Sequence, residues 1–147
     1  MEKNIFATLV LSLLLATLST SGAAATIPNM PRTLSNARFV YVVAYDGDQF
    51  SPNLLPEDRA AIARVEDGIE KWGKLVLVYR PQEADVILAV QSRPSEDVLA
   101  VYDAHSGDWG SRPSQVYLWR VMGRGGFEKS EVPLFAQFEK ARDKMAK

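Results

Sequence analysis

The chain has no cysteine and only one histidine among its 147 residues. The absence of cysteine excludes disulfide bonds, a thiol nucleophile and a lipid-bearing cysteine after an export signal. The single histidine, His105, excludes a site built from two imidazoles of one chain, and with it most zinc arrangements. An all-oxygen calcium site stays open. The sequence therefore predicts a fold held together by packing alone, with no cofactor.

The chain also lacks an excess of charge of either sign and long apolar runs. The formal net charge is −1 at pH 7, which gives no reason to expect nucleic acid or an anionic membrane surface as a partner. The amino-terminal apolar run from Ile5 to Leu18 is interrupted by Thr8, Ser12 and Thr17. It is shorter than the roughly 20 residues of a membrane-crossing helix, so we expect no stable membrane anchor.

What this amino-terminal segment contains is the pattern of an export signal. Lys3 precedes the apolar run, and Ala23-Ala24-Ala25 supplies small residues suited to cleavage. The prediction is a signal peptide over residues 1–25 and an exported protein that works in the periplasm or outside the cell. Removing the segment takes away one acid, Glu2, and one base, so the net charge does not change.

The remaining chain has the size of one domain. Residues 26–36 contain two prolines and no periodicity, and they are predicted to be an extended leader before a single domain over 37–147. Strand patterns occupy 38–45, 74–79, 85–91, 97–103 and 115–122, and helical patterns run from Pro56 to Trp72 and onward from Pro133.

These patterns predict an α/β fold, a mixed sheet of about five strands with two helices in the order β-α-β-β-β-β-α. The first strand, the first helix and the second strand form a βαβ unit. The loop over 80–84 is short enough for a hairpin between the second and third strands. A second hairpin is expected between 97–103 and 115–122.

Several strands are apolar on both faces. Phe39, Tyr41, Val43 and Tyr45 alternate with Val40, Val42 and Ala44, and Tyr117 and Trp119 alternate with Val116 and Leu118. Two helices cover only about one face of such a sheet, and a large open apolar patch is uncommon on a monomer. The pattern predicts a protein partner or a homo-oligomer, with Tyr117 and Trp119 in the surface of association.

Two stretches carry a resemblance to a known group of proteins. Glu83 to Val90 (EADVILAV) and the pair Leu99 to Asp103 (LAVYD) and Val116 to Arg120 (VYLWR) are similar to strands of small exported bacterial envelope domains of unknown function. The similarity extends more distantly to the amino-terminal domain of TolB and the CsgG-like periplasmic modules. The resemblance implies a non-enzymatic envelope or secreted module, and it attaches no functional residue to this chain.

The loop from Asp103 to Trp109 gathers the densest set of reactive side chains: Asp103, His105, Asp108 and Trp109. Neighbours in one loop do not orient each other as a catalytic triad requires. A metal site from Asp103, His105 and Asp108 lacks a recognised spacing, and Asp46-Gly47-Asp48 starts like a calcium loop but lacks the later oxygen donors. The interpretations left are a solvated turn and a ligand contact through Trp109.

Arg120 is placed by period two with Val116, Leu118 and Met122 on an apolar face. A buried guanidinium needs a partner, for which Asp85, Asp103 and the charged stretch 93–97 are the candidates. The plainer interpretation is that the guanidinium of Arg120 reaches solvent at the sheet edge. The sharper one is an arginine that binds an anion or a partner.

Three hypotheses of function follow. The first is an exported, non-enzymatic module that binds a protein or itself through its sheet face. The second is an extracellular hydrolase that uses Asp46, Asp103 or Asp108 as acid and base, which requires two of them in one cleft. The third is a small-ligand binder that uses Trp109 and Arg120.

Overall fold

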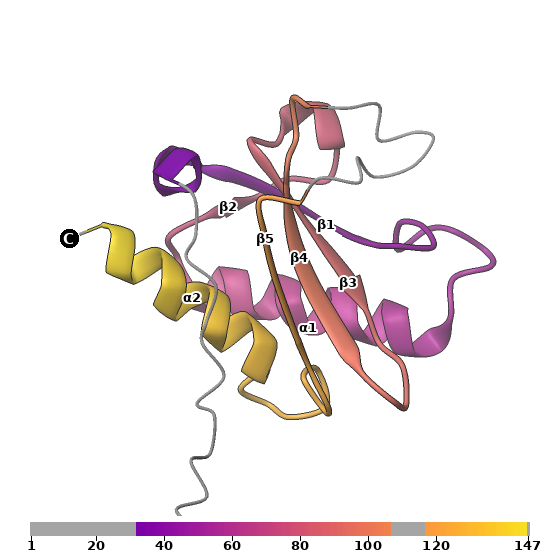
Figure 1. Cartoon of the computed structure of the whole chain (residues 1–147). Helices are drawn as coiled ribbons and strands as arrows, with labels where there is room; N and C mark the ends of the chain where they lie inside the picture. Colours follow the sequence, from indigo (N-terminus) through magenta and orange to yellow (C-terminus); the bar gives the residue numbers. More distant parts are fainter. Residues whose placement is uncertain (1–31, 107–116, 147) are drawn as a thin grey trace, which may run out of the picture.

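The computed structural model describes residues 32–106 and 117–146. Within these ranges the chain folds as a five-stranded mixed sheet with two α-helices, which confirms the predicted fold class (Figure 1). The elements in chain order are η1 (Arg32–Asn36), β1 (Phe39–Ala44), α1 (Pro56–Trp72), β2 (Val76–Leu77), η2 (Pro81–Glu83), β3 (Val86–Gln91), β4 (Asp97–Asp103), β5 (Trp119–Gly123) and α2 (Pro133–Met145).

The strand order across the sheet is β2-β1-β3-β4-β5. β1 pairs in parallel with both β2 and β3, whereas β4 is antiparallel to β3 and to β5. The predicted hairpin between 74–79 and 85–91 is therefore wrong. Val40 pairs with Leu77 on one side and with Val86 on the other, because β1 is apolar on both faces and suits a position inside the sheet. The short β2 lets the chain return through η2 to the other edge of β1.

α1 has the boundaries that its sequence predicts. Pro56 stands in the first turn, where a missing N–H costs nothing, and Gly73 ends the helix with φ of 69° while its N–H donates to the carbonyl of Ile69. Ile62, Val65 and Ile69 are fully buried and form the apolar stripe of the helix.

α2 packs beside α1 on the same side of the sheet (Figure 1). The Trp72 ring at the end of α1 lies edge-on to Phe135 and Phe138 of α2, with ring centroids 6.0 Å apart in both pairs. Gly68 makes this approach possible, because a Cβ at that position would lie 2.8 Å from Cδ1 of Phe135. The two helices thus form one layer.

The main core lies between this helical layer and one face of the sheet. Strand residues of one parity, such as Val40, Leu88 and Val121, share a buried cluster with the helix stripes. Trp119 belongs to this cluster and lies 5.9 Å from the ring of Phe138. The expectation that Trp119 joins Tyr117 in a surface of association is therefore wrong, since period two turns Trp119 towards α2.

The predicted leader does not stay extended over its whole length. Residues 32–36 form η1, and Leu34 is buried in the main core, while 26–31 lie outside the described residues. Nη2 of Arg142 donates to the carbonyl of Ala37 at 2.6 Å, which ties this region to α2. In the described part of the chain no helix is both long and apolar enough to cross a membrane.

Candidate functional site

The sheet face that turns away from both helices carries most of the tyrosines and is called the tyrosine face below. Its residues are Phe39, Tyr41, Val43, Tyr45, Val76, Ile87, Ala89, Gln91, Val98, Ala100, Tyr102, Arg120 and Met122. Neither helix contributes to the small buried cluster at its centre. Phe39 and Met122 are 41% and 47% exposed, so large apolar side chains of this face meet solvent.

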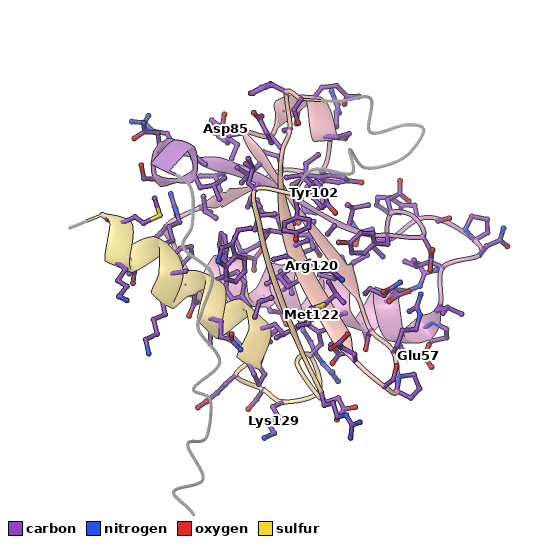
Figure 2. All side chains as sticks on the ribbon, in the orientation of Figure 1. Glu57, Asp85, Tyr102, Arg120, Met122 and Lys129 are labelled. Atoms are coloured by element: carbon purple, nitrogen blue, oxygen red, sulfur yellow. The ribbon has the colours of Figure 1, made fainter. Side chains whose placement is uncertain are left out.

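One row of side chains crosses the middle of the tyrosine face. Val43, Ala89, Ala100 and Arg120 are successive cross-strand neighbours on β1, β3, β4 and β5. The two alanines are small and fully buried, so the row is low between the bulkier rows on either side. Figure 2 shows Tyr102, Arg120 and Met122 one after another along β4 and β5. Arg120 therefore ends this row on the edge strand β5 and is the one charged residue among the strand residues of this face.

Two tyrosines join across this surface. The hydroxyl oxygens of Tyr45 and Tyr102 lie 3.0 Å apart, and their rings meet edge to face with centroids 6.4 Å apart. Burial, followed by the hydrogen bond to Tyr102, raises the pKa of Tyr45 well above its ordinary value of 10, although the positive charge of Arg120 acts in the opposite direction. The Tyr45 phenol stays protonated at neutral pH and serves as a polar but uncharged group beside the guanidinium.

In the described part of the chain, none of the candidate partners that the sequence offers for Arg120 forms an ion pair with it. Its guanidinium lies over the ring of Tyr117, with Cζ 5.8 Å from the centroid. Its Nε is buried and has no hydrogen-bond partner. Within the described residues, the ion pairs involve other cations, Lys74, Arg80 and Arg93.

The proposed partners of Arg120 are engaged elsewhere because they lie at strand ends. Asp85 accepts hydrogen bonds from the backbone N–H groups of Phe39 and Arg38, at 2.9 and 2.8 Å, and these bonds hold the pKa of Asp85 below its ordinary 3.8. Asp103 accepts from the backbone N–H of His105 at 2.9 Å. Arg120 instead pairs with Ala100 in the middle of the ladder.

The described part of the 103–109 loop forms a turn. Besides the bond from His105, the carbonyl of Asp103 accepts from the hydroxyl of Ser106 at 2.9 Å, and His105 is exposed. Asp108 and Trp109 lie outside the described residues. Asp103 and His105 lie in one turn, as the sequence requires, whereas the contact described for the Arg120 guanidinium is with Tyr117.

The two carboxylates of the hydrolase hypothesis that the structure describes, Asp46 and Asp103, are not brought together. Asp46 follows the end of β1, next to the end of β3, whereas Asp103 pairs with Val86 at the start of β3. The two lie at opposite ends of the sheet. Nη2 of Arg93 binds Asp46 at 2.6 Å, and in the described ranges no group of three or more potential metal ligands is found.

A buried polar network at the Asp46 end was missed by the sequence reasoning. Asp58 of α1 accepts from the guanidinium of Arg93 and from the backbone N–H of Ser92 at 2.7 Å. Asp97 accepts from the hydroxyl of Ser92 at 2.8 Å and from the backbone N–H groups of Arg93 and Phe127 at 3.2 Å. Both carboxylates are buried and fully engaged, so the network fixes loops and offers no open ligand position.

The sequence does contain a signal for these two residues. Asp58 falls on the helical stripe of Ile62, Val65 and Ile69, where an acid without a partner would be costly. Asp97 shares its period-two row with Leu99, and both are buried. An acidic residue within a periodic apolar pattern thus indicates a buried carboxylate that is hydrogen-bonded for structural reasons.

With the geometry established, comparison with known proteins adds no identification. The chain matches no family model, no curated protein and no solved structure. Function is therefore argued from the tyrosine face itself.

Proposed function

We propose that this protein is an exported, non-enzymatic module that binds another protein through the tyrosine face. The observation that carries the proposal is the division of the sheet: both helices pack on one apolar face, and the other apolar face carries exposed Phe39 and Met122. Large apolar side chains exposed on a sheet face that no helix covers are typical of an interaction site.

The composition of the face also suits recognition of a protein. Tyrosine and arginine are enriched at the energetic centres of protein interfaces, because a tyrosine ring buries a large area at low entropic cost while its hydroxyl bonds to polar groups. Tyr45 and Tyr102 are held together by their hydroxyls, and Tyr117 lies against Arg120. These contacts preorganise the side chains and reduce the cost of ordering them on binding.

The same surface is poorly suited to acid-base catalysis. Along the described strands its polar groups are phenols, one amide and one guanidinium, and Asp46 and Asp103 lie at opposite ends of the sheet. General acid-base chemistry needs two titratable groups within reach of one bond. Binding is the function that these side chains support best.

The export half of the proposal rests on residues 1–25 and has its own test. The whole sequence is expressed in a bacterium, and the amino terminus of the product is determined by mass spectrometry. We expect the mature chain to begin at Thr26 and to leave the cytoplasm. Retention of Met1 on a cytoplasmic product contradicts export while leaving the binding proposal intact.

Binding through the tyrosine face is tested by position-specific photo-crosslinking in the cells that naturally make the protein. A benzophenone side chain replaces Met122 on the face or, as a control, Leu55, which is similarly exposed at the start of α1. We expect one recurrent adduct of defined mass from position 122 and none of that mass from position 55. A lysine at Val43 on the same face should abolish the adduct.

The adduct mass then identifies the occupant. An adduct with a different protein supports the proposal, and one of twice the mass of the chain shows a second copy in its place. Equal labelling from positions 122 and 55, insensitive to Val43→Lys, contradicts use of this face. Circular dichroism of the purified variants shows that each remains folded.

A further inference from the structure

Among the described strand residues that point to the tyrosine face, Arg120 is the only charged one. Its neighbours are alanine, tyrosine and methionine, and its Nε is buried without a hydrogen-bond partner. A guanidinium in apolar surroundings is costly unless an anion pairs with it. The fold retains this group on the edge strand of the face, and none of the described strand residues that share the face is an acid.

Resting on the proposed function, we infer that the partner presents an aspartate or glutamate side chain, flanked by apolar residues, and that its carboxylate docks on Arg120. The guanidinium fork matches a carboxylate with two parallel hydrogen bonds, and because Nε is buried the two terminal Nη groups are the donors in this arrangement. Tyr117 holds one flat side of the guanidinium, which leaves the donors at its edge as the site of pairing.

The surroundings of the pair determine which residues flank the acid. Met122 and Val98 lie on one side of Arg120, and Tyr102 and Ile87 lie on the other, in adjacent cross-strand rows. Of these residues Met122 is exposed, so an apolar residue next to the partner's acid would pack on Met122 and exclude water from the ion pair. Exclusion of water strengthens the electrostatic attraction.

A second copy of the chain is a poorer occupant by the same reasoning. Symmetric pairing of two tyrosine faces would bring two Arg120 side chains into one interface, and the described strand residues that point to this face include no carboxylate to neutralise them. Like charges in a desolvated interface are unfavourable. Charge complementarity therefore favours a different, acidic partner.

The test uses a random peptide library displayed between fixed flanking sequences, so that no free carboxyl terminus is present. The library is selected on the purified protein, expressed from the whole sequence. Affinities of selected peptides are measured by fluorescence anisotropy for the wild type, Arg120→Gln and Arg120→Lys. Arg124→Gln is the matched control, because Arg124 is an exposed arginine just after β5. Met122→Lys reports whether peptides bind the tyrosine face.

We expect selected peptides to contain Asp or Glu between apolar residues and to lose affinity with Met122→Lys. Replacing that acid by its amide should weaken binding to the wild type by about thirtyfold or more. The same replacement should have little effect on binding to Arg120→Gln, which shows coupling between the two groups. Arg124→Gln should bind as the wild type does, and Arg120→Lys should fall between the wild type and Arg120→Gln.

Two outcomes overturn the inference and are distinguishable from failure of the proposed function. The acidic partner alone is refuted if the selected peptides need Met122 but show no preference for an acid. It is also refuted if their affinity is unchanged by Arg120→Gln, provided that this variant has the circular dichroism of the wild type. If light scattering detects self-association and Met122→Lys abolishes it, the occupant of the face is a second copy and not an acidic partner. If no peptide distinguishes Met122→Lys from Leu55→Lys, the proposed function fails together with the inference.

Discussion

Nη1 of Arg93 donates to both carboxylate oxygens of Asp58, at 2.9 and 2.8 Å, and this contact joins the turn after β3 to the first turn of α1. Asp58 is 1% exposed and the Arg93 side chain is 27% exposed. Nη2 of the same arginine binds Asp46 at 2.6 Å. The bond to Asp58 raises the pKa of Arg93 above its ordinary 12.5. One arginine therefore connects three segments at this end of the sheet.

Removing the buried partner of Arg93 should destabilise the fold strongly. Asp58→Asn leaves the guanidinium without its main counter-charge and the Ser92 N–H with a weaker acceptor. We expect a loss of about 3–5 kcal/mol in the free energy of unfolding, measured by urea titration with tryptophan fluorescence. The neighbouring exposed Glu57→Gln should change it by less than about 0.5 kcal/mol. Equal stability of the two variants would show that the pair does not hold the loops.

Asp85 should give the fold part of its dependence on acid pH. Its folded-state pKa lies below the ordinary 3.8, so its contribution is present above about pH 4. The contribution is lost as the pH falls through the folded-state pKa. Asp85→Asn should therefore lower stability at pH 7. It should also make the urea midpoint depend less on pH between neutral pH and about pH 2. Glu96→Gln, which removes the same charge from an exposed turn, should keep the wild-type slope.

Gly68 should not tolerate the substitution that usually stabilises a helix. Alanine in a helix interior is favoured over glycine by about 1 kcal/mol, but here its Cβ would lie 2.8 Å from Phe135. Overpacking costs about 1–3 kcal/mol, so we expect Gly68→Ala to lower the thermal midpoint. Asp67→Ala, at the preceding exposed position, should leave it nearly unchanged. A higher midpoint for Gly68→Ala would show that α2 shifts freely.

Tyr117 and Trp119 should differ sharply in their effect on stability. Trp119 packs against Phe138 in the main core, so Trp119→Ala should cost about 3–5 kcal/mol in urea unfolding. Tyr117 is exposed, and Tyr117→Ala should cost less than about 1 kcal/mol. A small loss for Trp119→Ala would mean that β5 has the opposite register, with Arg120 facing the helices.

Local signals predicted the elements well where they were strong. The proline, the apolar stripe and the terminal glycine of α1 all act within a few residues, and the helix has the predicted bounds from Pro56 to Trp72. The alternation in β1 likewise gives the observed alternation of buried and partly exposed side chains. Such features depend on backbone geometry and periodicity, which short stretches of sequence specify.

The pairing of strands was not accessible in the same way. A short loop favoured a hairpin between the second and third strands, but both pair with β1, because pairing depends on which edges are available after the whole sheet forms. The search for a partner of Arg120 in the sequence failed for a related reason. The candidate acids Asp85 and Asp103 lie at strand ends and already accept hydrogen bonds from backbone N–H groups.

The sequence by itself determined the class of fold, the positions of both helices, and the presence of more apolar strand surface than two helices can cover. Only the tertiary structure decided which face the helices take, that Trp119 belongs to the core, and that Arg120 stands on the tyrosine face opposite Ala100. Periodicity assigns residues to opposite faces, but contacts between distant strands and helices decide which of the two faces is covered.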